Sequence, residues 1–284
     1  MLSMIFRNNL SLSIGFLLIA MVLGMMIGCI DEIEGCLDNG ATNFNAVADI
    51  PCDDCCDFPD LRINVAHRIQ DSFSLSYGTP YPYLTMDSQA YFTISKVKFY
   101  LSNFRLESSS GAIAGVTDSI TLNLLDGTEV RVEDNFNLVT RDQNSFQYTI
   151  GTFKDVGTFE KIHFTVGLEP PASKTNPESL SNHPLAIQPD SIFSIDTERY
   201  IFNRITYVRD TSIMDTLSID VTDFMVEVEL DLPNPLTIER GFDIEIPVTI
   251  DYWEWLRGII FVTNVDDIRD SIVSNTAKAF SITE

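Results

Sequence analysis

The chain has 284 residues, of which 45% are hydrophobic, and its formal net charge is −23 at pH 7. This apolar content is sufficient for a large core and excludes an intrinsically disordered chain. The acidic excess argues against nucleic acid as a partner, because a polyanion would be repelled.

The first 28 residues are expected to be a lipoprotein signal peptide rather than part of the fold. One basic residue, Arg7, precedes an apolar run from Ile14 to Ile27. The run is shorter than the ~20 residues of a membrane-spanning helix. It ends in Met-Met-Ile-Gly before Cys29, which resembles a bacterial lipoprotein signal with cleavage before this cysteine and acylation of it. An uncleaved N-terminal anchor is the alternative, and a triacylated Cys29 would supply the several chains that stable anchoring needs.

Assigning Cys29 to lipid leaves an even set of cysteines in a short segment: Cys36, Cys52, Cys55 and Cys56. In an exported protein this set predicts two disulfides, with three alternative pairings. A zinc site built from Cys36 and the C-x-x-C-C run is the alternative.

Residues 29–60 are expected to form an acylated N-terminus and a cysteine-rich, stapled spacer. Acidic residues directly behind the lipid site resemble the surface-export signals of Bacteroidetes lipoproteins: Asp31, Glu32 and Glu34. The run GCLDNGATNFNAVAD resembles a short extracellular repeat of the same bacteria. Four of the side chains near it carry the oxygens that calcium prefers: Asp38, Asn43, Asn45 and Asp49. Asn, Asp and Gly turns explain the same composition, and we favour turns over a calcium site.

Residues 61–284 alternate with a period of two and are predicted to form one all-β domain, an antiparallel β-sandwich with long loops. Two examples are LRINVAHRI, which places His67 on the apolar face, and FDIEIPVTI, which aligns Phe242 with Ile244. Two short helices are expected near the C-terminus, at 251–258 and 265–275. A proline-rich, irregular stretch covers 167–191, and loops of this kind often carry function.

The run KVKFYLSNFRL, residues 96–106, changes the face of its apolar residues partway along. Phe99 and Leu101 share one parity, whereas Phe104 and Leu106 have the other. One extra residue in a strand re-aims everything after it, so this pattern predicts a β-bulge at Ser102–Asn103.

KVKFYLSNFRL resembles the hallmark strand of the MbnP-like proteins, copper-associated β proteins linked to methanobactin operons. Three further stretches agree in order with that family: FEKIHFTVGLEP, NHPLAIQPDSIF and IPVTIDYWEWLRGIIF with IVSNTAKAF. The resemblance implies a periplasmic or surface β-sandwich. In some members it also implies a copper site of histidine and an oxidised tryptophan, with a di-haem peroxidase-like partner.

The resemblance makes His183, in the Asn-His loop, the candidate copper ligand. The tryptophan of that loop is absent, because Ser191-Ile192-Phe193 stands in its place. A copper site that pairs His183 with His67 is one hypothesis, and a buried, neutral core histidine is the ordinary interpretation of His67. His163 has the parity of a solvent-facing residue.

The leading hypothesis is a lipid-anchored, non-enzymatic binding protein on the outer membrane, facing the periplasm or the cell surface. Its cargo or partner would meet the 167–191 loop, and the family resemblance suggests copper as the ligand. A di-haem peroxidase-like protein or a TonB-dependent transporter would be the partner. The alternative is a surface adhesion or assembly module without a metal site. Hydrolase motifs, Walker loops and dinucleotide glycine patterns are absent from the sequence, so an enzyme is the least supported hypothesis.

Overall fold

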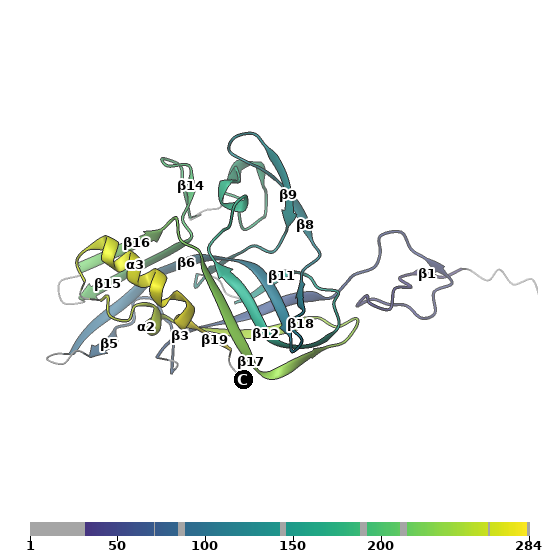
Figure 1. The fold of residues 1–284 in the computed structure, drawn as a ribbon, viewed down its shortest axis with the longest axis horizontal. Coiled ribbons are helices and arrows are strands. Elements are labelled where there is room, and N and C mark those ends of the chain that lie inside the picture. Colours follow the sequence, from purple (N-terminus) through teal and green to yellow (C-terminus); the bar gives the residue numbers. More distant parts are fainter. Residues whose placement is uncertain are drawn as a thin grey trace, which may run out of the picture. The chain divides into compact units, whose positions relative to one another are not determined.

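The structure is a computed structural model that describes residues 32–70, 72–84, 89–142, 146–187, 192–210, 215–260 and 262–282 (Figure 1). The predicted signal peptide and the lipid site at Cys29 lie outside the described residues. The described chain separates into a small unit, 32–37 with 45–56, and a large unit, 38–44 with 57–282. Segment 38–44 is therefore grouped with the β domain, although the sequence placed it in the spacer.

The small unit contains two short parallel strands, β1 (Glu34–Gly35) and β2 (Ile50–Pro51). Its four cysteines form two disulfides, Cys36–Cys56 and Cys52–Cys55. The predicted disulfides are confirmed with one of the three pairings, and no cysteine of this set is left as a thiolate for zinc.

The four oxygen-bearing side chains considered for calcium act as acceptors of backbone hydrogen bonds, two of them in local turns and two between segments distant in sequence. Asp49 accepts the backbone N–H of Ile33, and Asn45 accepts that of Val47. In the large unit, Asp38 accepts the N–H of Gly40, and Asn43 accepts that of Asp57. Each contact accounts for one side-chain oxygen without a cation.

The large unit is built on two sheets that run antiparallel, with one exception. The larger sheet has the order β16-β15-β6-β12-β17, and β5, β7 and β10 also pair with β6. The second sheet has the order β11-β3-β18-β19, with β4 paired to β3, and its β3–β18 pair is parallel.

The strands of the larger sheet are β5 (Tyr81–Leu84), β6 (Gln89–Ser108), β7 (Ile113–Gly115), β10 (Asn137–Thr140), β12 (Gly157–Val166), β15 (Asn203–Asp210), β16 (Asp215–Val221) and β17 (Val226–Ile238). The second sheet contains β3 (Asp60–Ile69), β4 (Phe73–Ser74), β11 (Gln147–Thr152), β18 (Ile244–Asp251) and β19 (Phe280–Ile282). Two hairpins stand apart from both sheets, β8 (Ser119–Asn123) with β9 (Glu129–Glu133) and β13 (Phe193–Ser194) with β14 (Arg199–Tyr200).

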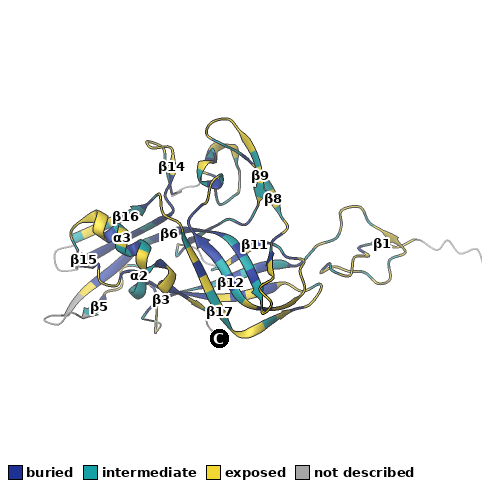
Figure 2. Cartoon of the chain, in the orientation of Figure 1, coloured by how far each residue is buried: buried dark blue, intermediate teal, exposed yellow. Residues whose placement is uncertain are grey.

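The main core lies between the two sheets and is filled by the alternating residues of their strands (Figure 2). Every second residue of β3 is buried, as its period of two predicted. Phe242 was predicted to share the buried face with Ile244, but it is 66% exposed. The reason is that β18 begins only at Ile244, and the alternation starts there. The predicted β-sandwich is confirmed.

Two short helices follow β18, as the sequence predicted. Helix α2 (Tyr252–Trp255) starts after Asp251, whose carboxylate accepts the N–H of Trp253. Helix α3 (Val265–Thr276) is capped by Asn264 and buries Ile268 and Ile272. A short 3₁₀ turn, η3 (Ala277–Ala279), leads into β19. Within the described chain, none of the helices has the length and apolarity that a membrane crossing requires.

A second, smaller core lies on the other side of β6, and we call it the outer core. It is formed by Tyr100 from β6 together with residues of the two hairpins and of the loop that follows β12: Leu122, Leu168, Ala172, Leu185, Ile192, Tyr200, Ile201 and Phe202. The loop contains two 3₁₀ turns, η1 (Ala172–Lys174) and η2 (Pro177–Ser179). We call the loop and the two hairpins the outer layer.

Candidate functional site

The bulge predicted in β6 is present and sets the geometry of the outer layer. His163 of β12 pairs with Arg105, and Thr165 pairs with Ser102. Between these pairs β12 has one residue while β6 has two, and the extra residue, Asn103, has a φ of 56°. The bulge keeps Leu101 and Phe104 in the same core in spite of their different parity.

Ser102 joins the bulge to the start of the loop. Its buried hydroxyl donates to the carbonyl of Gly167 at 2.8 Å, and the Gly167 N–H donates to the carbonyl of Tyr100 at 2.9 Å. Gly167 has a φ of 124°, which a residue with a side chain rarely adopts. The Ser-Asn strand and the Val-Gly-Leu-Glu-Pro turn are thus in direct contact, and this contact directs the chain into the outer layer.

Two buried tyrosines hold the far end of the loop. The hydroxyl of Tyr200 donates to the carbonyl of Leu185 at 2.7 Å, and the hydroxyl of Tyr100 donates to the carbonyl of Pro184 at 3.3 Å. Burial raises the pKa of both phenols, so both stay protonated and able to donate. The middle of the loop is held by β8, because the N–H of Asn176 donates to the carbonyl of Asn123 in that strand at 2.8 Å. The proline-rich loop is therefore fixed at both sides by the elements beneath it.

His183 lies between these anchors, and protein groups engage both of its ring nitrogens. Its Nε2 lies 2.9 Å from a carboxylate oxygen of Asp134, and its Nδ1 accepts the N–H of Leu185 at 3.1 Å. Because Nδ1 accepts, the neutral ring carries its proton on Nε2 and donates it to Asp134. The side chain is 11% exposed and packs edge-on against Phe136. In this arrangement, neither nitrogen offers a lone pair to a metal ion.

His67 lies in the main core rather than in the outer layer. Its Nδ1 is 2.7 Å from the hydroxyl of Tyr252, its ring meets Phe146 edge-on, and its Nε2 has no hydrogen-bond partner among the residues that the structure describes. Burial, with a smaller contribution from the charge of Arg141, lowers the pKa of His67 to about 3. The prediction of a buried, neutral histidine with one hydrogen-bond partner matches this placement.

His163 does not face open solvent as its parity suggested. Its side chain is 15% exposed, because Glu107 of the neighbouring strand lies 2.7 Å from its Nε2. Glu229 lies opposite it on β17, with a carboxylate oxygen 3.9 Å from Nδ1. The outward face of this sheet therefore forms a charged ladder that covers the imidazole.

The described part of the chain does not gather these donors into a metal site. His67 contacts Tyr252 and Phe146, whereas His183 contacts Asp134 and Phe136. Within the described ranges, no three His, Cys, Asp or Glu side chains are arranged to hold a metal ion. The residues present therefore do not fit an assembled copper site.

The two tryptophans have structural roles. Trp255 is fully buried in the main core, where its Nε1–H donates to the hydroxyl of Thr276 at 3.0 Å. Trp253 packs against Tyr83 and Phe92. Both tryptophans pack in or against the main core of the sandwich. Neither therefore lies where the resemblance expects the tryptophan of the loop.

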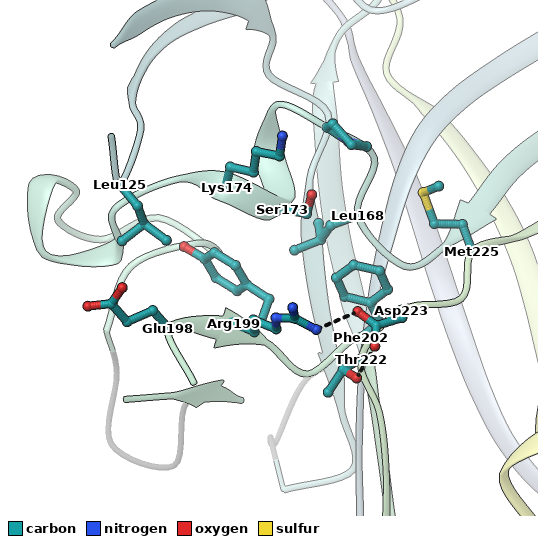
Figure 3. A pocket seen from close by; sticks show the side chains of 12 residues that line it. Leu125, Leu168, Ser173, Lys174, Glu198, Arg199, Phe202, Thr222, Asp223 and Met225 are labelled. Carbon is teal, nitrogen blue, oxygen red and sulfur yellow. Dashed lines mark hydrogen bonds and ion pairs between the residues drawn. The ribbon is translucent and has the colours of Figure 1, made fainter. Parts of the chain in front are cut away.

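A pocket of about 350 Å³ opens beside the loop (Figure 3). Leu168 and Lys174 come from the loop, Arg199 and Tyr200 from β14, and Met225 from the segment before β17. Sequence reasoning found only the loop, because the other walls come from hairpins whose positions depend on how the outer core packs. An isolated apolar residue in a turn, such as Leu125, is the sequence signal that could have indicated one of these walls.

Comparison with known proteins identifies the family of this chain. No curated protein matches the chain. Among solved structures, MbnP from Methylosinus trichosporium is similar, with 11% sequence identity and a TM-score of 0.41 over 69% of this chain and 76% of that one. The model of the MbnP family matches residues 59–274, well over half of the sequence. The chain therefore belongs to the MbnP family.

Proposed function

We propose that this protein is a non-enzymatic binding protein, held at the outer membrane by lipid on Cys29, that recognises its cargo through the outer layer. The observation that carries this proposal is the outer core. Its nine buried residues form a cluster of their own, and the two-sheet core is a separate set of residues. A layer with its own core, joined to β6 of the larger sheet by the hydrogen bonds of Ser102 and Tyr100, is a suitable platform for recognition.

Family membership associates the chain with copper, and copper is therefore the first ligand to test. His183 is the histidine that belongs to the loop of the outer layer. To bind copper it would have to exchange Asp134 or the Leu185 N–H for the metal, because both nitrogens are engaged. Imidazole is a suitable donor for copper, and an acidic neighbour such as Asp134 orients metal-binding imidazoles in other proteins.

Copper binding is best measured on the exported protein, purified in detergent with its lipid. Equilibrium dialysis against Cu(I) and Cu(II) would compare the wild type with His183→Gln, His67→Gln and, as a matched control, His163→Gln. Binding tighter than about 1 μM that weakens at least tenfold in His183→Gln alone supports a copper role at the outer layer. Absence of such binding, or binding that all three variants retain, ends the copper version of the proposal.

The anchoring and the partners are separate parts of the proposal. Labelling cells with a palmitate analogue should mark the wild type and not Cys29→Ser, which should also leave the membrane fraction. Cross-linking in intact cells tests the proposed partners, a di-haem peroxidase-like protein or a TonB-dependent transporter. Recovery of neither protein, with a surface-adhesion partner instead, would favour the alternative of an adhesion module.

A further inference from the structure

The pocket beside the loop has an apolar floor that belongs to the outer core. Leu168, Tyr200 and Phe202 line it, and all three are almost completely buried. The hydroxyl of Tyr200 is already used by the Leu185 carbonyl, so the ring offers the pocket mainly apolar surface. Met225 adds a half-exposed thioether at the edge. Aromatic rings with a thioether form a surface that suits a flat apolar group.

The acidic side chains around this floor do not present a free negative charge to it. Arg199 donates to one carboxylate oxygen of Asp223 at 3.2 Å, and the Thr222 hydroxyl donates to the other at 3.0 Å. The charge of Asp223 is therefore compensated within the pocket wall. In Figure 3, the carboxylate of Glu198 points away from Leu168 and Phe202. Neither acid directs an uncompensated negative charge at the floor.

Lys174 is the cation that remains. It lies on the opposite side of Leu168 from Arg199 (Figure 3), and it forms no ion pair among the described residues. The pKa of Asp126 is lowered mainly by backbone and side-chain hydrogen bonds from Thr128, and the charge of Lys174 makes a smaller contribution. Asp126 lies in the turn after β8 and does not line the pocket. Lys174 lines the same pocket as the apolar floor. A cation in the wall of an apolar pocket favours a ligand that carries a negative charge on an apolar body.

We propose that this pocket binds a small amphipathic anion, an aromatic or branched carboxylic acid, with its apolar body on Tyr200 and Phe202 and its carboxylate at Lys174. The size agrees, because about 350 Å³ lies within the range of small-molecule sites and near its lower end. The site needs neither copper nor His183, so it is independent of the metal proposed above.

Three probes that share one ring system test the proposal: 2-naphthoate, which is anionic, 2-naphthol, which is neutral, and 2-naphthylmethylammonium, which is cationic. Each is titrated calorimetrically into the exported protein in detergent, with a chelator present to exclude metal. The expected order is 2-naphthoate tightest, with a Kd of about 100 μM or below, and at least tenfold tighter than the cation.

Two variants locate the charge. Lys174→Glu should weaken 2-naphthoate at least tenfold and strengthen the cationic probe, while Lys174→Gln should fall between this variant and the wild type. Lys154→Glu is the matched control, because Lys154 is also exposed, carries the same charge and lies over Phe58, outside this pocket. It should change the Kd of 2-naphthoate less than twofold.

Three results would overturn the proposal. If 2-naphthoate does not bind at 1 mM, the pocket has no such ligand. Equal affinity for all three probes would mean that the surface is merely apolar. Equal weakening by Lys154→Glu and Lys174→Glu would mean that the overall charge of the chain, and not this lysine, sets the preference.

Discussion

The Nδ1 atom of His67 lies 2.7 Å from the hydroxyl oxygen of Tyr252, and the two rings are parallel to within 2°. The parallel pairing of β3 with β18 produces this contact, because it places His67 opposite Ile250, two residues before Tyr252. Tyr252 is itself completely buried. The pair is thus a polar contact enclosed in the main core, and within the described part of the chain the other imidazole nitrogen has no hydrogen-bond partner.

We predict that His67 makes the protein sensitive to acid. Its pKa is lowered from 6.5 to about 3 in the folded state, chiefly by burial. Below pH 6.5 the unfolded chain takes up a proton that the folded chain does not, so stability falls as the pH decreases toward 3. Between pH 6.5 and 4 the loss should be roughly 3 kcal/mol. Urea unfolding across this range would measure it.

His67→Phe should flatten this acid limb, because no titrating group remains at the site. Tyr252→Phe is the control: it removes the hydrogen bond but keeps the imidazole buried, so it should keep the limb at a lower overall stability. An equal pH dependence in the wild type and His67→Phe would show that other groups cause the acid sensitivity.

The bulge at Asn103 gives a second prediction, on backbone strain. Asn103 has a φ of 56°, which asparagine and glycine tolerate and β-branched residues do not. Asn103→Val should lower the free energy of unfolding by about 1–2 kcal/mol relative to Asn103→Gly, which meets no such strain. Urea midpoints of the two variants provide the measurement. Equal midpoints would mean that the strand can lose its bulge without cost.

The sandwich and the bulge were accessible from the sequence because both leave a local signature. A strand with one face in the core must alternate, and an extra residue must shift that alternation. The run KVKFYLSNFRL therefore predicts both the strand and its bulge without any other part of the chain. The disulfides were accessible as a set, because an even number of cysteines in a short exported segment is informative. Their pairing was not, because three connectivities satisfy the same count.

The outer layer was only partly accessible. The loop at 167–191 stands out by its prolines, but Tyr100, which packs beneath it, belongs to a strand whose alternation assigns it to an outward face. An alternating pattern shows which face of a strand points away from the main core, but it cannot show that a second layer packs on that face. The contact of Ser102 with Gly167 is equally invisible, because it joins two segments that are 65 positions apart.

That contact supports a third prediction. The Ser102 hydroxyl is buried and donates to the Gly167 carbonyl, so Ser102→Ala leaves this acceptor without its partner. The expected loss of stability is about 1–2 kcal/mol. Because Gly167 begins the loop, the same variant should increase hydrogen exchange at the hydrogen-bonded amides of Gly167 and Ser173. Ser218→Ala is a control, since that hydroxyl bonds Thr206 on an exposed face and should have little effect. Unchanged exchange in the loop would contradict the proposed link.

The two disulfides should differ in how readily they are reduced, because their sulfurs differ in access to solvent. Cys55 is an exposed residue, whereas Cys36 is only 2% exposed. Thiol–disulfide exchange needs direct approach to a sulfur atom, so a limiting amount of a small thiol should open Cys52–Cys55 first. Alkylation at timed intervals, followed by peptide mass spectrometry, would follow each cysteine separately. In denaturant the difference should shrink, because burial no longer protects Cys36. Labelling of Cys36 and Cys56 before Cys52 and Cys55 in the folded protein would contradict this order.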